Sequence, residues 1–301
     1  MPSTFTAVSY GPTLPHASLR QVRSVLAANG FEVGAESRES HPGFDCATFA
    51  LASVGSDKGD AVARLRAALA AAPVENVDTA VVPDTLRTAE RKFIIMDVDS
   101  TLIQQEVIEL LASHAGTEAE VAKVTAAAMR GELDFAQSLH HRVATLAGLP
   151  ESVLAEVGRK VKLSVGAERL VTQAKAAGHT VAAVSGGFSQ ILAPLAAKLG
   201  LDFALANDLE IIDGRLTGKV SGAVVDRAAK AASLRAWSAK AGIGQGATMA
   251  IGDGANDLDM MAAAALGVAF NAKPAVRAVA DAQINLPNLD VALVLAGIPG
   301  E

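Results

Sequence analysis

Cysteine and the large aromatic residues are scarce in this chain. Of 301 residues, one is cysteine (Cys46), one is tryptophan and one is tyrosine, and aromatic residues make up only 4%. A single cysteine excludes an intrachain disulfide and is typical of a reducing compartment. Half of the residues are apolar, so the bulk of the core must be alanine, valine, leucine and isoleucine.

The chain also lacks long apolar runs and an excess of positive charge. No window approaches the ~18 apolar residues of a membrane span, and the start MPSTFTAVSYGPTLP has neither the basic residues nor the apolar stretch of a secretory signal. The net charge of −6 argues against binding along a nucleic-acid backbone. We therefore expect a cytoplasmic protein with no nucleic-acid or membrane partner, in which any anion site is local.

The pattern of the chain changes near residue 85. A length of 301 residues exceeds the ~100–200 residues of one domain. Residues 4–82 alternate as strand, helix, strand, strand, helix, strand, an order typical of ferredoxin-like units and similar to the ACT regulatory domain. This segment contains no cluster of catalytic residue types, so we predict a binding or dimerisation role and a homodimer; a plain folding partner is the alternative. The polar segment 83–92 precedes a strong strand, and we divide the chain into 1–85 and 86–301.

From residue 93 on, apolar strands alternate with helices. The strands FIIMDV, TVAAVS, FALAN, TMAIGD and GVAF are almost continuously apolar, which is typical of a parallel sheet covered by helices on both faces. The long segment between the first two strands is wholly helical in pattern, with TEAE as a helix start and Gly131 as its stop. We expect an inserted helical cap over about 104–162. The segment IIDGRLTG predicts a hairpin that turns at Asp213-Gly214.

Two carboxylates follow the first of these strands, in KFIIMDVDSTLIQQE. Asp97 and Asp99 flank one residue, so on an extended strand both side chains face the same way, where like charges require a counter-ion. Mg²⁺ suits this position because it accepts oxygen ligands and shares phosphate oxygens with a few carboxylates. A third carboxylate, Asp253, follows a later strand in AIGDGANDLD, with Asp257 as a supporting residue. Alone, DVDST could cap a helix and DGAND could be a plain turn; a calcium loop fails because Leu102 stands where it requires glycine.

Two further elements could bind an anion. Ser185 ends a strand and Gly186-Gly187 lead into a helix, where backbone N–H groups can approach a phosphate without a Cβ in the way. A tight turn is the alternative for SGGF. Lys230 lies on a helix of the second half, and by itself it would be a solvated side chain.

Together and in this order, DVDST, Ser185, Lys230 and GDGAND resemble the haloacid-dehalogenase phosphatase superfamily, and within it the phosphoserine phosphatase family over roughly residues 92–290. The resemblance implies a Rossmann-like α/β core with a helical cap, and Mg²⁺-dependent hydrolysis of O-phospho-L-serine as the last step of serine biosynthesis. It implies that Asp97 attacks phosphorus, that Asp99 is the acid and base, and that Mg²⁺ binds Asp97, Asp253 and the Asp99 carbonyl. The residues that it assigns to the substrate are Glu106, Met129, Phe135, Arg142, Ser185, Gly186, Lys230 and Asn256.

The residue pattern independently supports two of these assignments. Arg142 falls three residues after Leu139 on an apolar helix stripe, where a cation is costly unless it meets an anion. Glu106 lies beside the apolar stripe of the first cap helix, within reach of the mouth of the site.

Three alternatives remain open at this point. A relative that passes the phosphoryl group to homoserine would have the same residues. An amino-acid-sensing regulatory protein with an inactive phosphatase half is a different class, against which the intact motifs count. His140-His141 could suggest a metal site, but the chain has no H-E-x-x-H spacing, and a solvated helix face is the simpler interpretation.

Overall fold

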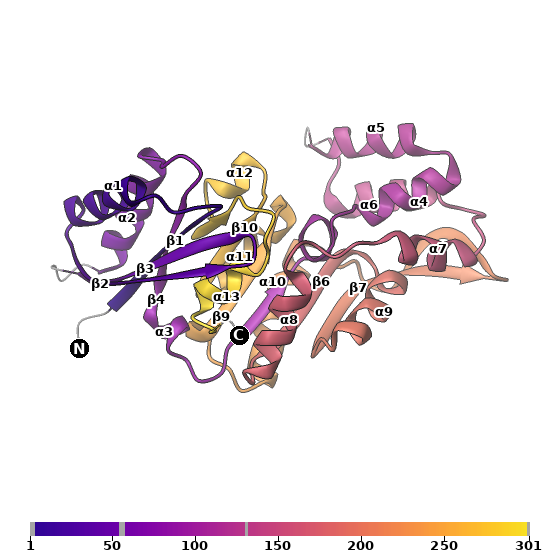
Figure 1. The fold of residues 1–301 in the computed structure, drawn as a ribbon. Coiled ribbons are helices and arrows are strands. Elements are labelled where there is room, and N and C mark those ends of the chain that lie inside the picture. The colour runs from indigo at the N-terminus through magenta and orange to yellow at the C-terminus, as the bar shows by residue number, and fades with distance from the viewer. Residues whose placement is uncertain (1–3, 54–57, 130–131, 300–301) are drawn as a thin grey trace.

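The computed structural model describes residues 4–53, 58–129 and 132–299. The first four strands form an antiparallel sheet in the order β2-β3-β1-β4, and two helices pack on one face of it (Figure 1). This is the βαββαβ order that the sequence predicts. The elements are β1 (Thr4–Gly11), α1 (His16–Ala28), β2 (Phe31–His41), β3 (Phe44–Ser53), α2 (Lys58–Ala71) and β4 (Asp78–Pro83).

The other face of this four-stranded sheet packs against the rest of the chain. Tyr10 is fully buried in the same apolar cluster as helix α13 (Val291–Ala296). Its hydroxyl donates a hydrogen bond to the backbone carbonyl of Gln283. The backbone and side-chain N–H groups of Asn285 donate to the Asp78 carboxylate at 2.9 and 2.8 Å. Apolar and polar contacts therefore fix this unit to the main body.

A seven-stranded sheet forms the centre of the main body. Its order is β11-β10-β9-β5-β6-β7-β8, and all neighbours are parallel except the β7–β8 pair. The central strand is buried on both faces, which explains its continuous apolar run. The predicted α/β core is confirmed, and β11 was missed because three residues show no periodicity. The strands are β5 (Phe93–Met96), β6 (Thr180–Phe188), β7 (Phe203–Ile212), β8 (Arg215–Ser221), β9 (Thr248–Gly252), β10 (Leu266–Phe270) and β11 (Ala282–Ile284).

Helices cover both faces of this sheet. Alternate residues of β5 point to opposite sides: Ile94 and Met96 pack in one cluster with α8, α9 and α13, and Phe93 and Ile95 pack in another with α10 and α11. None of the helices in the described ranges has the length and apolar character needed to cross a bilayer. The covering helices not yet given bounds are α8 (Ala167–Ala176), α9 (Ser189–Leu199), α10 (Arg227–Lys240) and α11 (Leu258–Ala263). Two short helices of the same chain are α3 (Asp84–Arg87) and α12 (Pro274–Arg277).

Four more helices, between β5 and β6 in the chain, fall within the predicted cap segment. Figure 1 shows α4, α5 and α6 together on the side of the core away from the β1–β4 unit. The predicted stop at Gly131 lies outside the described residues. The cap helices are α4 (Val107–Ala115), α5 (Glu118–Met129), α6 (Phe135–Ala144) and α7 (Ser152–Lys160).

The β7–β8 hairpin supports the base of this cap. Its turn residues Asp213 and Gly214 have φ of 50° and 70°, so the predicted hairpin and its turn are confirmed. The N–H of Gly148 donates to the Leu216 carbonyl at 2.8 Å, and that of Glu151 donates to the Gly214 carbonyl at 2.8 Å. The segment between α6 and α7 is therefore tied to the core sheet.

Candidate active site

A cavity of about 700 Å³ lies where the carboxyl ends of β5, β6 and β9 meet the cap helices α4 to α6. Ligands of open α/β sheets bind at this edge. Every lining residue lies at or after Asp97, so the β1–β4 unit contributes none of its described residues to this cavity. Most predicted site residues line it, namely Asp97, Asp99, Glu106, Phe135, Arg142, Gly186, Asp253 and Asn256.

The turn after β5 brings both aspartates to the cavity, although not as the sequence predicted. Strand β5 ends at Met96, and residues Val98–Leu102 form a tight turn in which Asp99 and Ser100 have non-helical backbone angles. Within it Ser100 has a left-handed backbone with φ of 56°. The expectation that Asp97 and Asp99 share an extended strand is therefore wrong, because the chain curls after the first carboxylate.

Lys230 forms a buried ion-pair cluster beneath the cavity. Its Nζ lies 2.7 Å from Asp97 Oδ1 and 2.8 Å from Asp257 Oδ1, and the Lys230 and Asp257 side chains are fully buried. The N–H of Val98 also donates to Asp97 Oδ1 at 2.7 Å. Lys230 is thus not the solvated side chain that its sequence context alone would indicate. Lys230 does not line the cavity either; it contacts Asp97 in the buried interior.

Burial and mutual repulsion dominate the electrostatics of this cluster. Burial and the nearby Asp257 raise the pKa of Asp97 well above its ordinary value, while Lys230 lowers it. Burial alone would lower the pKa of Lys230, but the Asp97 and Asp257 carboxylates raise it. Burial and Asp257 likewise raise the pKa of Asp253 to about 7. Three neighbouring carboxylates therefore share a single lysine, and the cluster lacks positive charge.

These carboxylates could hold a metal ion. Asp97, Asp253 and Asp257 each offer an oxygen, and these atoms all lie within 4.8 Å of one another. The hydroxyl of Thr101 donates to Asp253 at 3.2 Å and orients it. An all-oxygen donor set that is short of positive charge fits a hard divalent cation.

Asp99 is held by two hydrogen bonds. Its Oδ1 accepts from the N–H of Val107 at 2.7 Å, at the start of α4, and its Oδ2 accepts from the Ser185 hydroxyl at 3.0 Å. Burial, followed by the charge of Glu106, raises the pKa of Asp99 to about 6. The side chain can therefore both hold and release a proton near neutral pH.

The SGGF segment differs in two respects from its sequence interpretation. Gly186 and Gly187 belong to β6, and α9 begins only at Ser189, so these N–H groups are not at a helix N-terminus. Ser185 is buried, and its hydroxyl also accepts from the N–H of Gly187 at 2.7 Å. A Cβ on Gly186 would come within 2.7 Å of the Phe135 ring. A larger residue at position 186 would therefore force the Phe135 ring to shift.

The cap supplies charged groups of both signs. Glu106 precedes α4 and accepts a hydrogen bond from the Ser100 hydroxyl at 2.7 Å. Arg142 lies on α6, and its Nε donates to the Ser138 carbonyl at 3.2 Å. Burial lowers the pKa of Arg142, while the charges of Glu106 and Asp99 raise it. Met129 is the last residue of α5, and its side chain lies outside the described residues.

Several lining residues were not predicted from the sequence. Arg227 and Lys273 are exposed cations in the lining, and Ser100, also in the lining, donates a hydrogen bond to Glu106. Thr101 is buried outside the lining and orients Asp253. The two hydroxyls stand inside DVDST, so the motif itself could have indicated them. Arg227 and Lys273 are surface-type residues in their local sequence, and only the folded chain brings them to the cavity.

Comparisons with known proteins show the family to which the chain belongs. The model of the haloacid dehalogenase-like hydrolase family matches residues 94–262. A phosphoserine phosphatase from Streptomyces coelicolor is 59% identical over 238 residues, or 79% of this chain and 58% of that protein. One from Streptococcus thermophilus is 50% identical over 196 residues, or 65% of this chain and 91% of that protein. This chain thus spans little more than half of the Streptomyces protein.

A solved structure also resembles the chain over nearly its full length. The probable phosphoserine phosphatase from Vibrio cholerae, in unliganded form, superimposes with a TM-score of 0.77 at 34% identity. The superposition covers 97% of this chain and 87% of that one, so it includes the four-stranded unit as well as the main body.

Proposed function

Because the chain belongs to the haloacid dehalogenase-like hydrolase family, we propose that it is a phosphoserine phosphatase, which hydrolyses O-phospho-L-serine to serine and phosphate in the last step of serine biosynthesis. The observation that best supports this is a cavity lined by two chemically different sets of residues. Asp97 and Asp253 follow the core strands β5 and β9, and Glu106 and Arg142 come from the cap, at the start of α4 and on α6. A phosphate with its metal suits the first pair, and an amino acid's ammonium and carboxylate suit the second pair.

Asp97 is the proposed nucleophile. Its carboxylate attacks phosphorus to form an aspartyl-phosphate as the serine oxygen leaves, and water then hydrolyses this intermediate. Lys230 opposes the effect of burial on the Asp97 pKa and so favours the ionised carboxylate that attacks.

Asp99 is the proposed acid and base. With a pKa of about 6 it can give a proton to the leaving serine oxygen and then accept one from the attacking water. The bonds from Val107 and Ser185 hold the carboxylate in place for both steps. Ser185, Gly186 and Asn256 are the proposed partners of the phosphate oxygens.

Mg²⁺ is the proposed cofactor. Asp97, Asp253 and the Asp99 carbonyl are its proposed ligands, and Asp257 supports them through Lys230. When bound, Mg²⁺ supplies positive charge that offsets the charge on the transferring phosphate. The raised pKa values of Asp97 and Asp253 support this proposal, because they show carboxylates that lack a compensating positive charge.

Phosphate release from O-phospho-L-serine, measured with Mg²⁺ and with EDTA, tests this proposal. We expect release with Mg²⁺ and none with EDTA, because the carboxylates would then repel the substrate phosphate. Undiminished release in EDTA would rule out the metal. Homoserine added as an acceptor separates the alternative reaction, since phosphohomoserine would form at the expense of free phosphate.

Replacing Arg142 by alanine should impair recognition of the amino-acid end. We expect kcat/KM for phosphoserine to fall by about 2–5 kcal/mol in transition-state stabilisation, the range for truncating one partner of a desolvated charge pair. Hydrolysis of p-nitrophenyl phosphate, which has no such end, should change far less. Arg159→Ala, on an exposed part of α7, is the matched control. Equal losses on both substrates would show that Arg142 serves folding.

We also propose a division of labour between residues 1–85, an ACT-like unit, and residues 86–301, a phosphatase unit with a cap over about 104–162. The cytoplasmic location remains a prediction.

We further propose a homodimer, with its contact on α1, α2 or the edge strand β2, since the remaining face of the small sheet already packs on the main body. Light scattering should give twice the chain mass of 30.6 kDa. A mass of one chain would contradict the dimer.

A further inference from the structure

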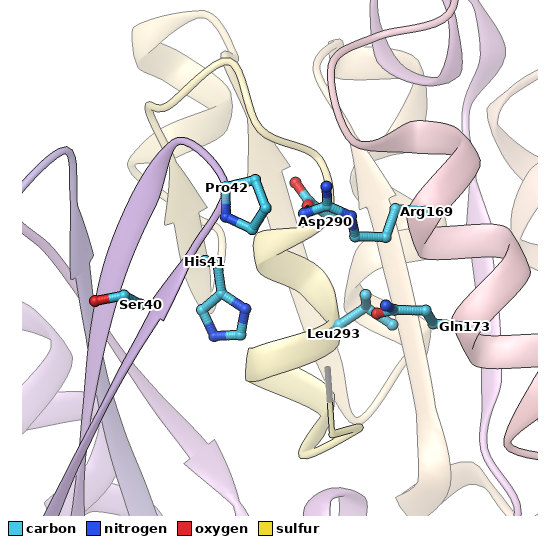
Figure 2. A pocket seen from close by; sticks show the side chains of 7 residues that line it. All are labelled: Ser40, His41, Pro42, Arg169, Gln173, Asp290 and Leu293. Carbon is cyan, nitrogen blue, oxygen red and sulfur yellow. The ribbon is translucent and has the colours of Figure 1, made fainter. Parts of the chain in front are cut away.

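The positively charged side chains around the cavities differ in whether they already have a partner. In a smaller cavity of about 150 Å³, between the β2–β3 turn and helices α8 and α13, Arg169 donates to the Asp290 carboxylate at 2.9 Å (Figure 2). In the candidate active site, Arg227 donates to the Asp259 carboxylate at 2.5 Å. The side chain of Lys273, in the same lining, makes no hydrogen bond or ion pair with any described residue. Its ammonium is therefore available to a ligand.

The backbone of Lys273 is held beside the carboxylates of the candidate active site. Lys273 lies between β10 and α12, and its backbone nitrogen is 3.5 Å from the carbonyl oxygen of Asp253. Two residues earlier, Asn271 has a left-handed backbone with φ of 44°. The N–H of Asn271 donates to the Ile284 carbonyl at 2.8 Å, and its side-chain amide donates to the Leu286 carbonyl at 3.1 Å. The Lys273 side chain is thus unpaired, whereas the turn that carries it is fixed.

The lining as a whole is short of positive charge for an anionic ligand. It contains five acidic and three basic side chains. Of the basic ones, Arg142 lies on the cap helix α6, close enough to acidic groups for their charges to raise its pKa. Lys230 is buried between Asp97 and Asp257 and does not line the cavity. A phosphate dianion near Asp97 is repelled unless unpaired positive charge meets it, and Lys273 supplies such a charge.

We propose that the Lys273 ammonium binds the phosphate group of the substrate from the exposed edge of the cavity and sets the affinity of the site for phosphomonoesters. This inference rests on the proposed function, which places the phosphate beside Asp97 and Asp253. Lysine suits the role because its ammonium is a compact charge with three donors on a flexible stem. The contact is the same before and during the chemical step, so it lowers KM and leaves kcat unchanged.

The kinetics of Lys273→Met with phosphoserine and with p-nitrophenyl phosphate test this inference. We expect KM to rise about tenfold on both substrates while kcat stays within about threefold, because one charge-assisted hydrogen bond to the phosphate is lost. The two substrates share only the phosphate, so an equal loss distinguishes Lys273 from Arg142, whose substitution should affect phosphoserine far more. Lys273→Arg keeps the charge and should stay within about threefold of the unsubstituted protein.

Binding of inorganic phosphate separates this inference from the proposed function. Isothermal titration calorimetry of the full chain with phosphate, in the presence of Mg²⁺, requires no turnover. We expect Lys273→Met to weaken phosphate binding by about tenfold. Phosphate binding that depends on Lys273 in a chain without phosphoserine hydrolysis would contradict the proposed function and support the phosphate contact. Hydrolysis of phosphoserine with phosphate binding that is unchanged in Lys273→Met would do the reverse.

Lys198→Met is the matched control. Lys198 is an exposed lysine of α9 that does not line the cavity, so the same change in net charge should leave KM and phosphate binding unchanged. A loss in Arg227→Met with none in Lys273→Met would assign the contact to Arg227 and overturn the inference. A fall in kcat without a rise in KM would equally overturn it.

The substitution at Lys273 should not disturb folding. The residue is exposed, and its side chain makes no capping hydrogen bond to α12, so the melting temperature of Lys273→Met should match that of the unsubstituted protein. If this variant does not fold, Lys273→Gln, which also removes the charge, decides the outcome.

Discussion

Replacing Asp97 by asparagine should reduce phosphate release from phosphoserine by about 10³–10⁶-fold, the scale of losses when a covalent nucleophile is removed. The amide is nearly isosteric but cannot form the acyl-phosphate. Stability should not fall with activity, because burial and Asp257 both disfavour the ionised Asp97 that the substitution removes. Lys230 would keep its partner Asp257. The expected result is a folded, inactive protein, seen as lost turnover with an unchanged or higher melting temperature.

Asp213→Asn provides the matched control. Asp213 is exposed at the β7–β8 turn with φ of 50°, a conformation that asparagine adopts readily, so activity and melting temperature should stay as they are. Substantial turnover in Asp97→Asn that is not explained by deamidation, which mass spectrometry would detect, would refute the nucleophile assignment. A large drop in its melting temperature would show instead that Asp97 is needed for the fold.

Replacing Lys230 by methionine should have the largest effect on stability. The substitution leaves Asp97 and Asp257 buried together without their counter-charge, and removing one partner of a buried ion pair costs about 3–5 kcal/mol. In a protein of this size each kcal/mol lowers the melting temperature by about 2–4 °C. Activity should be lost as well, because Lys230 holds the proposed nucleophile.

The loss of stability in Lys230→Met should depend on pH, because the groups left without a counter-charge are carboxylates. Without Lys230 the pKa of Asp97 in the folded state should lie still further above its unfolded value, because Lys230 is the group that lowers it. Stability of the variant is then retained at low pH, where Asp97 is protonated, and is lost as the pH rises through the folded-state pKa of Asp97. Thermal melts at pH 5 and pH 8 measure this difference, and the defect should be larger at pH 8.

A double substitution separates charge from packing. Adding Asp257→Asn to Lys230→Met removes one of the two unpaired carboxylates and should restore part of the stability without restoring activity. If the double variant is less stable than Lys230→Met, the lysine contributes through the packing of its aliphatic stem. An unchanged melting temperature in the single variant would show that the cluster carries little net stability.

The sequence predicted the fold well because its signals are local. A strand buried on both faces must be apolar throughout, so β5 and its neighbours were visible as short runs such as FIIM. The hairpin at Asp213-Gly214 was visible because its turn needs two residues with positive φ. The exposed edge strand β2 and the three-residue β11 carry weaker patterns, and β11 was missed.

The candidate site could be predicted only in part, because sequence signals are local. Asp97 and Asp253 follow predicted strands, so their approach at one edge of the sheet could be inferred. The curl at Ser100 could not, because a left-handed serine has no sequence signature of its own. The rim residues Arg227 and Lys273 gave no signal, because nothing in their local sequence distinguishes them from other surface cations.

The sequence by itself determined that residues 4–82 form a βαββαβ unit, that a parallel α/β core with a helical insertion follows, and that Asp97 and Asp253 stand at strand ends. These properties depend on residues that are near one another in the chain. Only the tertiary structure decided that Lys230 is a buried partner of two carboxylates and that Ser185 bonds to Asp99. Each of these depends on burial and on distances between residues remote in sequence, which packing of the whole chain sets and a local pattern does not encode.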